Sequence, residues 1–425
     1  MKRGFHTVMA AQFFSSLADN ALFPAAVAWL RLNDAPEWQS AALVPIFALF
    51  YVVLAPFLGA FADSLPKGQV MFWSNAIKII GCLMMLLGVH PLLSFAVVGL
   101  GAAAYSPAKY GILTEMLPCS QLVKANGWME GLTMLSIILG VVLGGQLVGV
   151  PISSLLLAID VPLINTGIDT PPQAAICVLM AVYLLAALFN LRIPRTTAPL
   201  QPLTNNLRIL VNDFSRCNAK LWADKLGQIS LATTTLFWGA SANLKYIVLA
   251  WAAAVLTFDT TQATTLSGVV AIGLAGGAVL ASARTRLDQA TRVIPLGIIM
   301  GLLVMAMVLV HSVWIAVPFL IILGALAGYL VVPMNALLQH RGHKLMGAGR
   351  SIAVQNFFEQ ASVLGLGGIY VGMTHAGMPV TGTVATFGLL VAATMAAVMA
   401  WHSRNTMTHR AELERLYAIA RSDKD

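Results

Sequence analysis

The sequence predicts an all-α integral membrane protein with twelve transmembrane helices in two pseudo-symmetric six-helix halves. Of its 425 residues, 58% are hydrophobic and only 10% are charged, against roughly a quarter charged in a typical soluble domain. The apolar runs are about twenty residues long, the length that a helix needs to cross the hydrocarbon, whereas spanning strands would give alternating segments of about ten. A repeated polar pattern, described below, predicts the two halves.

The apolar runs define the twelve spans and, with the basic residues, the topology. The spans lie near residues 8–30, 41–62, 70–88, 92–108, 124–150, 173–191, 229–255, 262–283, 293–310, 314–338, 350–373 and 379–401. If both termini are cytosolic, all but three of the 25 Lys and Arg residues, namely Arg31, Lys78 and Lys245, fall in cytosolic segments or at cytosolic helix ends. Because Lys and Arg collect on the cytosolic side of membrane proteins, this bias predicts the orientation. It also accounts for the net charge of +8 without a nucleic-acid partner.

This topology predicts four parts of the chain. They are an N-terminal six-helix half (1–191), a cytosolic connector (192–225), a C-terminal six-helix half (226–401) and a cytosolic tail (402–425). The connector is basic and is expected to be an amphipathic segment on the membrane surface. In the tail, a short apolar helical face predicts an interfacial cytosolic helix; its members are Ala411, Leu413, Leu416, Tyr417 and Ile419.

A polar helix pair occurs once in each half. The stretch from Gly101 to Glu130 is expected to break at Ser106-Pro107, to leave the membrane, and to return in a helix with Asn126 and Glu130 on one face, since these are four residues apart. The pattern recurs 226 residues later: Pro107, Lys109 and Lys124 correspond to Pro333, Asn335 and Arg350, and an Asn356/Glu359 pair follows. A repeated polar pair in so apolar a chain predicts a site between the halves.

The first helix carries Asp19 and Asn20 near its middle. A charged group there costs about 3 kcal/mol on insertion scales and normally faces a cavity or a partner. Either a structural hydrogen bond between helices or a lining or coupling role would explain it, and we favour the second. The seventh helix has Asn243 at the matching place and Lys245 two residues on. Lys245 is interpreted as a counter-ion for Asp19, as a binder of anionic substrate, or as an interfacial residue.

The segment GAFADSLPKG, residues 59–68, resembles the G-x-x-x-D-R-x-G-R/K loop of the major facilitator superfamily, with Ser64 at the place of the arginine. We expect Asp63 to cap a neighbouring helix and Lys67 to stay in the headgroup zone, together forming a gating loop. A looser counterpart in the second half is formed by Arg284, Arg286 and Asp288. The resemblance implies two six-helix halves around a midplane cavity.

Longer motifs are similar to a single family. The stretches LADNAL, YSPAKYGIL, LVKANG, TLFWGASANLKY, VVPMNALLQHRG and GAGRSIAVQNFFE resemble the bacterial lysophospholipid transporter (LplT) family of that superfamily, over nearly all of the chain up to the tail. The resemblance implies inward flipping of lysophospholipids, chiefly lysophosphatidylethanolamine, across the inner membrane of Gram-negative bacteria. There a cytosolic acyltransferase and acyl-carrier ligase system re-acylates them. The candidate substrate-binding or coupling residues are Asp19, Asn20, Lys109, Tyr110, Lys124, Asn126, Glu130, Trp238, Asn243, Lys245, Asn335, Gln339, Arg350, Gln355, Asn356 and Glu359.

The residues alone indicate a secondary transporter of an amphiphile or a small solute. Cationic and amide side chains suit a phosphate, whereas Asp19, Glu130 and Glu359 suit an ammonium. The same carboxylates would suit a proton-coupled exporter of drugs or small metabolites, which is the alternative function. A membrane-embedded acyltransferase would need a His-Asp couple near a helix end, and the chain offers no defensible one. Without a Walker sequence, a G-x-S-x-G elbow or an HExxH motif, we expect no enzyme activity, cofactor or metal, and a monomer.

Overall fold

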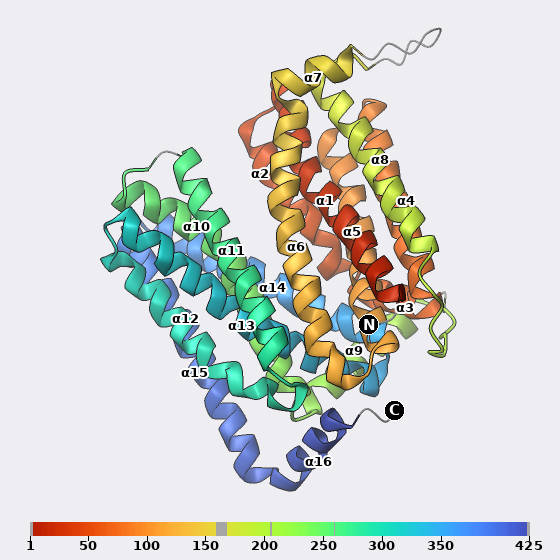
Figure 1. Ribbon diagram of the computed structural model, residues 1–425, viewed down its shortest axis with the longest axis vertical. Helices are drawn as coiled ribbons and strands as arrows, with labels where there is room; N and C mark the ends of the chain where they lie inside the picture. Colours follow the sequence, from red (N-terminus) through yellow and green to blue (C-terminus); the bar gives the residue numbers. More distant parts are fainter. Residues whose placement is uncertain (1–2, 159–167, 205, 259, 423–425) are drawn as a thin grey trace. The chain divides into compact units, whose positions relative to one another are not determined.

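The computed structural model describes residues 3–158, 168–204, 206–258 and 260–422, and every regular element within them is a helix (Figure 1). The elements are α1 (Arg3–Leu32), α2 (Glu37–Val53), α3 (Ala55–Ser64), α4 (Lys67–Leu86), α5 (Pro91–Met116), α6 (Cys119–Val148), α7 (Val150–Leu157), α8 (Pro171–Leu191), α9 (Leu207–Ala223), α10 (Gly227–Val255), α11 (Thr260–Arg284), η1 (Leu287–Val293), α12 (Ile294–Ala306), η2 (Met307–Leu309), α13 (Val313–Met346), α14 (Ala348–His375), α15 (Val380–Thr408) and α16 (Arg410–Arg421).

Each of the twelve predicted spans falls on a helix or a helix pair, which confirms the fold class. Among the described residues, nine helices are long and apolar enough to cross a membrane, and the α2–α3 pair, bent by 67°, makes a tenth. The two predicted spans that fall outside this set are α10 and α14. Both are rich in polar residues. The helix α10 carries Asn243 and Lys245, and α14 carries Gln355 and Glu359. Part of the candidate site residues therefore lies on these two helices.

The expected break at Ser106-Pro107 is wrong. The helix α5 continues through Pro107 to Met116, and α13 likewise continues through Pro333 to Met346. A proline removes one backbone hydrogen bond, but in a spanning helix neighbouring groups and local adjustments can satisfy the freed carbonyl. The proline that we took as a stop is therefore a residue inside a longer helix. The candidate residues around it, Lys109 and Asn335, are helical.

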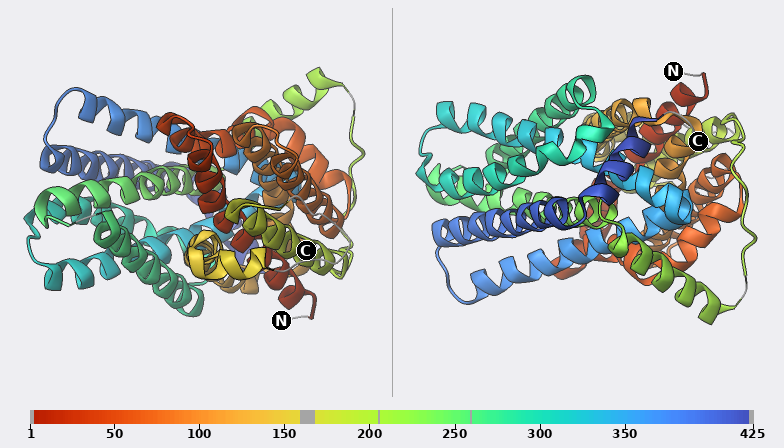
Figure 2. Two further views of the ribbon diagram at one scale, coloured as in Figure 1. Left: turned by 90° about the horizontal axis from the view of Figure 1, so that it is seen from above. Right: turned by 90° about the horizontal axis from the view of Figure 1, so that it is seen from below.

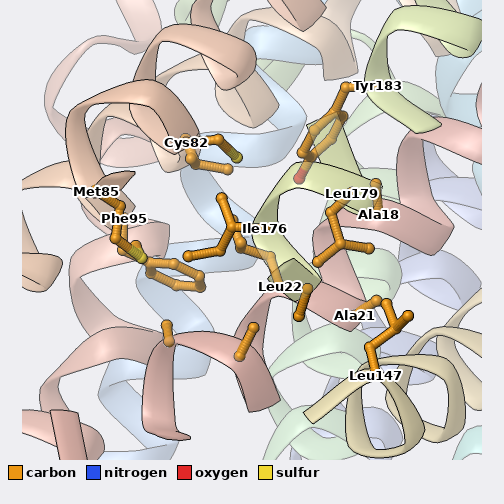
Figure 3. Packing of buried hydrophobic residues seen from close by; sticks show 14 of the residues in the cluster. Ala18, Ala21, Leu22, Cys82, Met85, Phe95, Leu147, Ile176, Leu179 and Tyr183 are labelled. Atoms are coloured by element: carbon orange, nitrogen blue, oxygen red, sulfur yellow. The ribbon is translucent and has the colours of Figure 1, made fainter. Parts of the chain in front are cut away.

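The chain divides into two compact units by packing. The first unit comprises Met1–Ile112 and Leu135–Leu207, and the second comprises Leu113–Met134 and Arg208–Asp425. The core of the first unit is formed where α1 and α4 pack on α8 (Figure 3). Small residues allow close approach there: a Cβ added at Gly144 would meet the backbone of Ala21. Close packing of this kind is how helices associate in lipid.

The second unit has its own helix pairs. Within this unit, α11 packs against α13, and α12 packs against α15; Figure 2 shows the helices of this unit along their length. The α11–α13 contact also depends on glycines, because a Cβ at Gly277 or Gly328 would meet the backbone of Ala325 or Leu274. The N-terminal part of α6, up to Met134, packs in this unit, although its C-terminal part packs in the first. It therefore brings Asn126 and Glu130 to the second unit.

Two amphipathic helices lie outside the predicted spans, and both dock on the second unit. The connector contains α9, whose Leu210, Cys217 and Leu221 are buried. The tail contains α16, whose Leu413, Leu416 and Ala420 are buried and which packs against η1. Each helix therefore buries part of its apolar surface against protein, whereas Leu207, Ile209 and Val211 of α9 and Ala411 of α16 are exposed.

Candidate functional site

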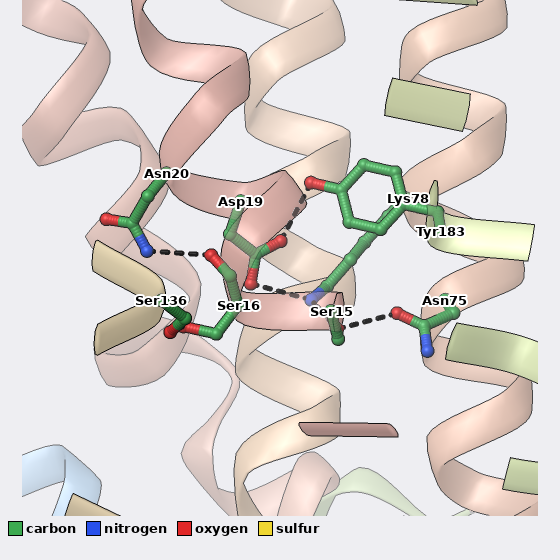
Figure 4. A network of polar contacts seen from close by, with 8 residues as sticks. All are labelled: Ser15, Ser16, Asp19, Asn20, Asn75, Lys78, Ser136 and Tyr183. Atoms are coloured by element: carbon green, nitrogen blue, oxygen red, sulfur yellow. Dashed lines mark hydrogen bonds and ion pairs between the residues drawn. The ribbon is translucent and has the colours of Figure 1, made fainter. Parts of the chain in front are cut away.

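The first polar cluster lies inside the first unit and is centred on Asp19 of α1 and Lys78 of α4 (Figure 4). The Lys78 Nζ lies 2.8 Å from Asp19 Oδ2 and donates a hydrogen bond of 2.9 Å to Ser15 Oγ. Ser15 in turn donates to Asn75 Oδ1 at 2.8 Å. The second oxygen of Asp19 accepts a hydrogen bond of 2.8 Å from Tyr183 Oη on α8. Three helices are thus joined through one carboxylate.

The spacing of these residues explains why they meet. Ser15 and Asp19 are four residues apart on α1, and Asn75 and Lys78 are three apart on α4, so each pair occupies one helical face. Lys78 is 1% exposed and Asp19 is 19% exposed. A buried charge is tolerated only when it is paired and hydrogen-bonded. The Lys78 ammonium meets both conditions, because it has a carboxylate and a hydroxyl as partners.

The second polar cluster lies inside the second unit and joins α6, α13 and α14. Asn126 Nδ2 donates to Gln339 Oε1 at 3.0 Å, and Asn335 Nδ2 lies 3.4 Å from Glu130 Oε1. Gln355 Nε2 donates both to Asn335 Oδ1 at 3.0 Å and to Glu359 Oε1 at 2.7 Å. All six residues are buried: Asn126, Glu130, Asn335, Gln339, Gln355 and Glu359.

This second cluster connects two carboxyl groups through amides. Asn126 and Glu130 both meet α13, so they share one face of α6, as their four-residue spacing predicts. The chain of contacts runs from Glu130 through Asn335 and Gln355 to Glu359. Amide side chains both donate and accept, so they can bind polar groups of either sign. The cluster therefore offers hydrogen-bonding amides and two carboxyl groups within an apolar bundle.

The connector helix α9 is fixed by two ion pairs. Asp213 accepts from Arg350 Nε at 2.6 Å, and Asp224, next to the end of α9, accepts from Arg341 Nε at 3.1 Å. The Asp224–Arg341 pair is buried, with exposures of 7% and 6%. The candidate residue Arg350 therefore has a structural partner on the connector.

The gating loop also contains an ion pair. Lys67 Nζ lies 2.7 Å from Asp63 Oδ1 and donates to the backbone oxygen of Ala62 at 2.7 Å. Both charged side chains are buried, at 4% and 6% exposure. Asp63 lies in the last turn of α3 and Lys67 begins α4, so the pair bridges the turn between the two helices. The position of Lys67 in the headgroup zone stays a prediction.

The remaining candidates make other contacts in the described part of the chain. Lys245 is exposed and its Nζ lies 4.8 Å from the ring centre of Tyr246. Asn243 donates to the backbone oxygens of Gly239 and Val363, which ties α10 to α14. The other members of this group have local contacts or surface positions: Asn20 donates to Ser16 O, Lys109 lies over the Tyr110 ring at 4.3 Å, Lys124 is exposed, Trp238 packs edge-on against Phe237, and Asn356 is buried.

Sequence reasoning missed several functional partners. It offered Lys245 as a counter-ion for Asp19, whereas the structure pairs Asp19 with Lys78. The sequence did contain a signal for Lys78, since an ionisable residue within an apolar span is itself a candidate site residue. No local pattern marks Tyr183, which is one aromatic residue in an apolar helix. The phosphate-binding role of Lys245 stays a prediction.

The comparisons with known proteins fit this geometry. A family model described as Major Facilitator Superfamily matches residues 8–366. A relative from Photorhabdus laumondii named "Lysophospholipid transporter LplT" is 38% identical over 95% of this chain and 96% of its own length. A relative of the same name from Escherichia coli O7:K1 is also 38% identical, over 95% of this chain and 97% of its own.

The chain belongs to the lysophospholipid transporter (LplT) family of the major facilitator superfamily.

Solved structures support the fold of this LplT family member. The human organic anion transporter MFSD10 (TETRAN) matches with a TM-score of 0.72 over 94% of this chain and 100% of its own, at 14% identity. The transporter FucP in the outward conformation matches with a TM-score of 0.71 over 93% of this chain and 98% of its own, at 12% identity. At such identities the likeness concerns the fold alone. The chain is a multi-pass membrane protein of a transporter family.

Proposed function

We propose that the protein moves lysophospholipids, chiefly lysophosphatidylethanolamine, inward across a bacterial inner membrane without changing them chemically. The observation that carries this proposal is the 38% identity, over 95% of the chain, to relatives named for lysophospholipid transport. A lysophospholipid has a charged head and one apolar chain. The two buried polar clusters suit the head, and the apolar surfaces of the spans suit the chain.

The candidate residues have complementary roles in this proposal. Lys109 and Lys245 are proposed to contact the substrate phosphate, as ammonium groups bind phosphate by charge-assisted hydrogen bonds. The carboxylates Glu130 and Glu359 are proposed to act on the cationic part of the head or in coupling. Asp63 and Lys67 are proposed to gate the cytosolic side.

Uptake of labelled lysophosphatidylethanolamine tests the proposal. Spheroplasts that lack their own transporter should accumulate the lipid only when they produce this protein. Arg410 is exposed and, among the described residues, pairs with Glu414 four residues away on α16, so Arg410→Met is a matched control that should transport normally. Equal uptake with and without the protein would refute lysophospholipid transport.

A pair of substitutions tests the phosphate role of Lys245. Lys245→Arg keeps the charge and should retain most uptake, whereas Lys245→Met has similar length but no charge. Losing a charge-assisted hydrogen bond lowers binding by roughly ten- to a hundredfold. The apparent affinity for the lipid should fall by that factor in Lys245→Met. Equal affinities in the two variants would show that the charge at this position does not bind substrate.

The proposed orientation places both termini and the connector in the cytosol, and it places the product where a cytosolic acyltransferase and acyl-carrier ligase can re-acylate it. An alkaline phosphatase fused after Lys225 should therefore be inactive, because that enzyme needs an oxidising compartment to form its disulfides. An active fusion would reverse the topology. Conversion of the imported label to diacyl phospholipid would support the proposed partner system.

Proton-coupled export of a drug or small metabolite is the second candidate. The amide-linked carboxyl groups of Glu130 and Glu359 favour it, since paired buried carboxyl groups can exchange protons. Collapsing the proton gradient with an uncoupler separates the two. Lipid uptake that persists without the gradient favours the lysophospholipid proposal, whereas gradient-dependent efflux of a dye favours the exporter.

A further inference from the structure

An open groove lies where the end of α1 and the end of α6 meet the start of α8. Its volume is about 520 Å³, and ligand sites in proteins commonly measure about 300–1,000 Å³. All of its lining residues belong to the first unit. One of them, Arg31, is charged, and the others are apolar. This composition suits a ligand that has an apolar chain and one anionic group.

The α1 side of the groove is a single helical face. It is lined by Pro24, Val27, Ala28, Arg31 and Leu32, and residues three and four apart are neighbours on the surface of a helix. The rise from Pro24 to Arg31 is about 10 Å along the helix axis, at about 1.5 Å per residue. The guanidinium lies in the last turn of α1, and the apolar wall lies toward the middle of the helix. A bound amphiphile would therefore place its chain inward and its head outward.

The α8 side of the groove offers no hydrogen-bond donor from its first two residues. These are Pro171 and Pro172, which have no backbone N–H. The N–H of Thr170, just before them, donates to Gln173 Oε1 at 3.0 Å. A helix start normally attracts an anion through its free N–H groups, but these groups are missing or bound here. An anion in the groove would therefore bind to Arg31.

Arg31 lies where basic residues are uncommon in membrane proteins. In the proposed orientation it is on the periplasmic side, whereas Lys and Arg collect on the cytosolic side. Its side chain is exposed, and within the described part of the chain its guanidinium forms no ion pair. A cation in the last turn can stabilise a helix end, but that role does not account for the apolar wall beside it. A guanidinium binds phosphate through two parallel hydrogen bonds, which suits a phospholipid.

The groove is separate from the polar cluster around Asp19. Arg31 lies about 18 Å beyond Asp19 along the axis of α1, at about 1.5 Å per residue, and Asp19 does not line the groove. The described lining residues include no acid, so they offer no partner to a head-group ammonium. The groove therefore suits the phosphate and the chain of a lipid, and it does not select among uncharged and cationic head groups.

We propose that this groove is a loading site, where a lysophospholipid from the periplasmic leaflet binds before it enters the protein. This inference rests on the proposed lysophospholipid transport and adds the place where the substrate first binds. Arg31 binds the lipid phosphate, and the single chain lies along Pro24, Val27 and Ala28. Lysophosphatidylethanolamine and lysophosphatidylglycerol should load equally well, because they share the phosphate and the chain.

Photo-cross-linking tests this binding directly. Purified protein in detergent micelles is irradiated with lysophosphatidylethanolamine that carries a diazirine in its chain, and the labelled peptide is identified by mass spectrometry. The label should fall on α1 between Pro24 and Leu32, and unlabelled lysophosphatidylethanolamine and lysophosphatidylglycerol should compete equally. Glycerophosphoethanolamine, which has no chain, should not compete. The inference fails if this chainless head group, or diacyl phosphatidylethanolamine, competes as strongly as the single-chain lipids.

Substitutions test whether the groove acts in transport. In the spheroplast assay, Arg31→Met should raise the lipid concentration for half-maximal uptake about tenfold and leave the maximal rate unchanged, because loading precedes the transport step. Arg31→Lys keeps the charge and should stay close to the wild type. Ala28→Trp fills the groove and should resemble Arg31→Met. Val142, 57% exposed on α6, does not line the groove, so Val142→Trp is a matched control that should behave as the wild type.

The two measurements separate the loading site from the proposed transport. Wild-type protein that takes up no lysophospholipid refutes the transport, and the loading role fails with it. Normal wild-type uptake, combined with cross-links elsewhere or with an unchanged half-maximal concentration in both Arg31→Met and Ala28→Trp, refutes only the loading site. Lower thermal stability of Arg31→Met at an unchanged half-maximal concentration would assign Arg31 to the end of α1 and also overturn the inference. If Arg31→Met does not fold, Ala28→Trp and the competition experiment still decide.

Discussion

The loop between α3 and α4 and the loop between α11 and α12 occupy matching places in the two halves, but they hold their acidic residue differently. In the first loop, Asp63 pairs with Lys67, and both side chains are buried. In the second, Asp288 is bound by two exposed arginines, Arg286 at 3.4 Å and Arg421 at 2.9 Å. Arg421 belongs to the tail helix α16, which also contacts η1 through Tyr417 and Thr291 at 2.8 Å.

The difference shows that pseudo-symmetric halves need not be stabilised in the same way. The first loop contains its own base, since Asp63 in the last turn of α3 pairs with Lys67 at the start of α4. The second loop depends in part on α16, more than a hundred residues away in the chain. Burial also differs, so the first pair should contribute to stability and the second pair mainly to the docking of α16.

The largest effect is expected from Lys67→Met. This change removes the basic side of the buried Asp63–Lys67 pair, and breaking a buried pair on one side costs about 3–5 kcal/mol. The free energy of unfolding, measured by denaturant titration in micelles, should fall by that amount, and lipid uptake should fall with it. Asp63→Asn combined with Lys67→Met leaves no unpaired charge and should recover most of the loss. A double variant as unstable as Lys67→Met would mean that Lys67 acts through contacts other than this pair.

Much of this fold could be predicted from the sequence because membrane insertion imposes simple rules. Every apolar run corresponds to a helix or a helix pair, of which up to ten among the described residues are long and apolar enough to cross a membrane. The spacing of Asn126 and Glu130 predicted a shared face that the structure contains. Rules based on local sequence failed where contacts with neighbouring helices determine whether a helix continues. Pro107 looked like a stop, yet α5 continues through it, since only the surrounding helices determine whether a freed carbonyl is satisfied.

The candidate site was harder to predict from the sequence than the fold was. Asp19 was conspicuous because a carboxylate in an apolar span is rare, but its partner lies 59 residues away on α4. Spacing rules link residues within one helix and do not say which helices touch. The same limit hid the two ion pairs of α9 with Arg341 and Arg350. Hydrophobic patterning predicted an apolar face on each of the helices α9 and α16. It did not predict which of these apolar residues would be buried against other helices.

A smaller effect is expected from Tyr417→Phe, which removes a contact between α16 and the second loop. It removes the hydrogen bond with Thr291, worth about 0.5–1.5 kcal/mol. Burial raises the pKa of Tyr417 above its ordinary value, so above about pH 10 the unfolded state loses a proton that the folded state retains. Stability therefore falls as the pH rises past that value. Unfolding curves at pH 8 and 10.5 should show this loss in the wild type and a smaller one in Tyr417→Phe.

The smallest effect is expected from Arg421→Met, which tests whether the second loop needs the tail. Arg421 is 62% exposed, and exposed pairs contribute about 0.2–1 kcal/mol, so global unfolding should hardly change. Limited proteolysis near His409, between α15 and α16, should report the local opening of α16 instead. Cleavage should be faster in Arg421→Met than in the wild type at low ionic strength. The difference should shrink near 1 M salt, where the screening length is about 3 Å.

The matched control for this last test is Arg410→Met on the same helix. Arg410 pairs with Glu414 within α16 and does not hold the helix to the loop, so its loss should leave cleavage at His409 unchanged. Faster cleavage in both variants would mean that charge on α16, and not the contact with Asp288, keeps the helix docked. Faster cleavage in Arg421→Met alone would establish that the contact between Arg421 and Asp288 keeps α16 docked on the second loop. In the first loop, by contrast, Asp63 is bound by Lys67 of the same loop.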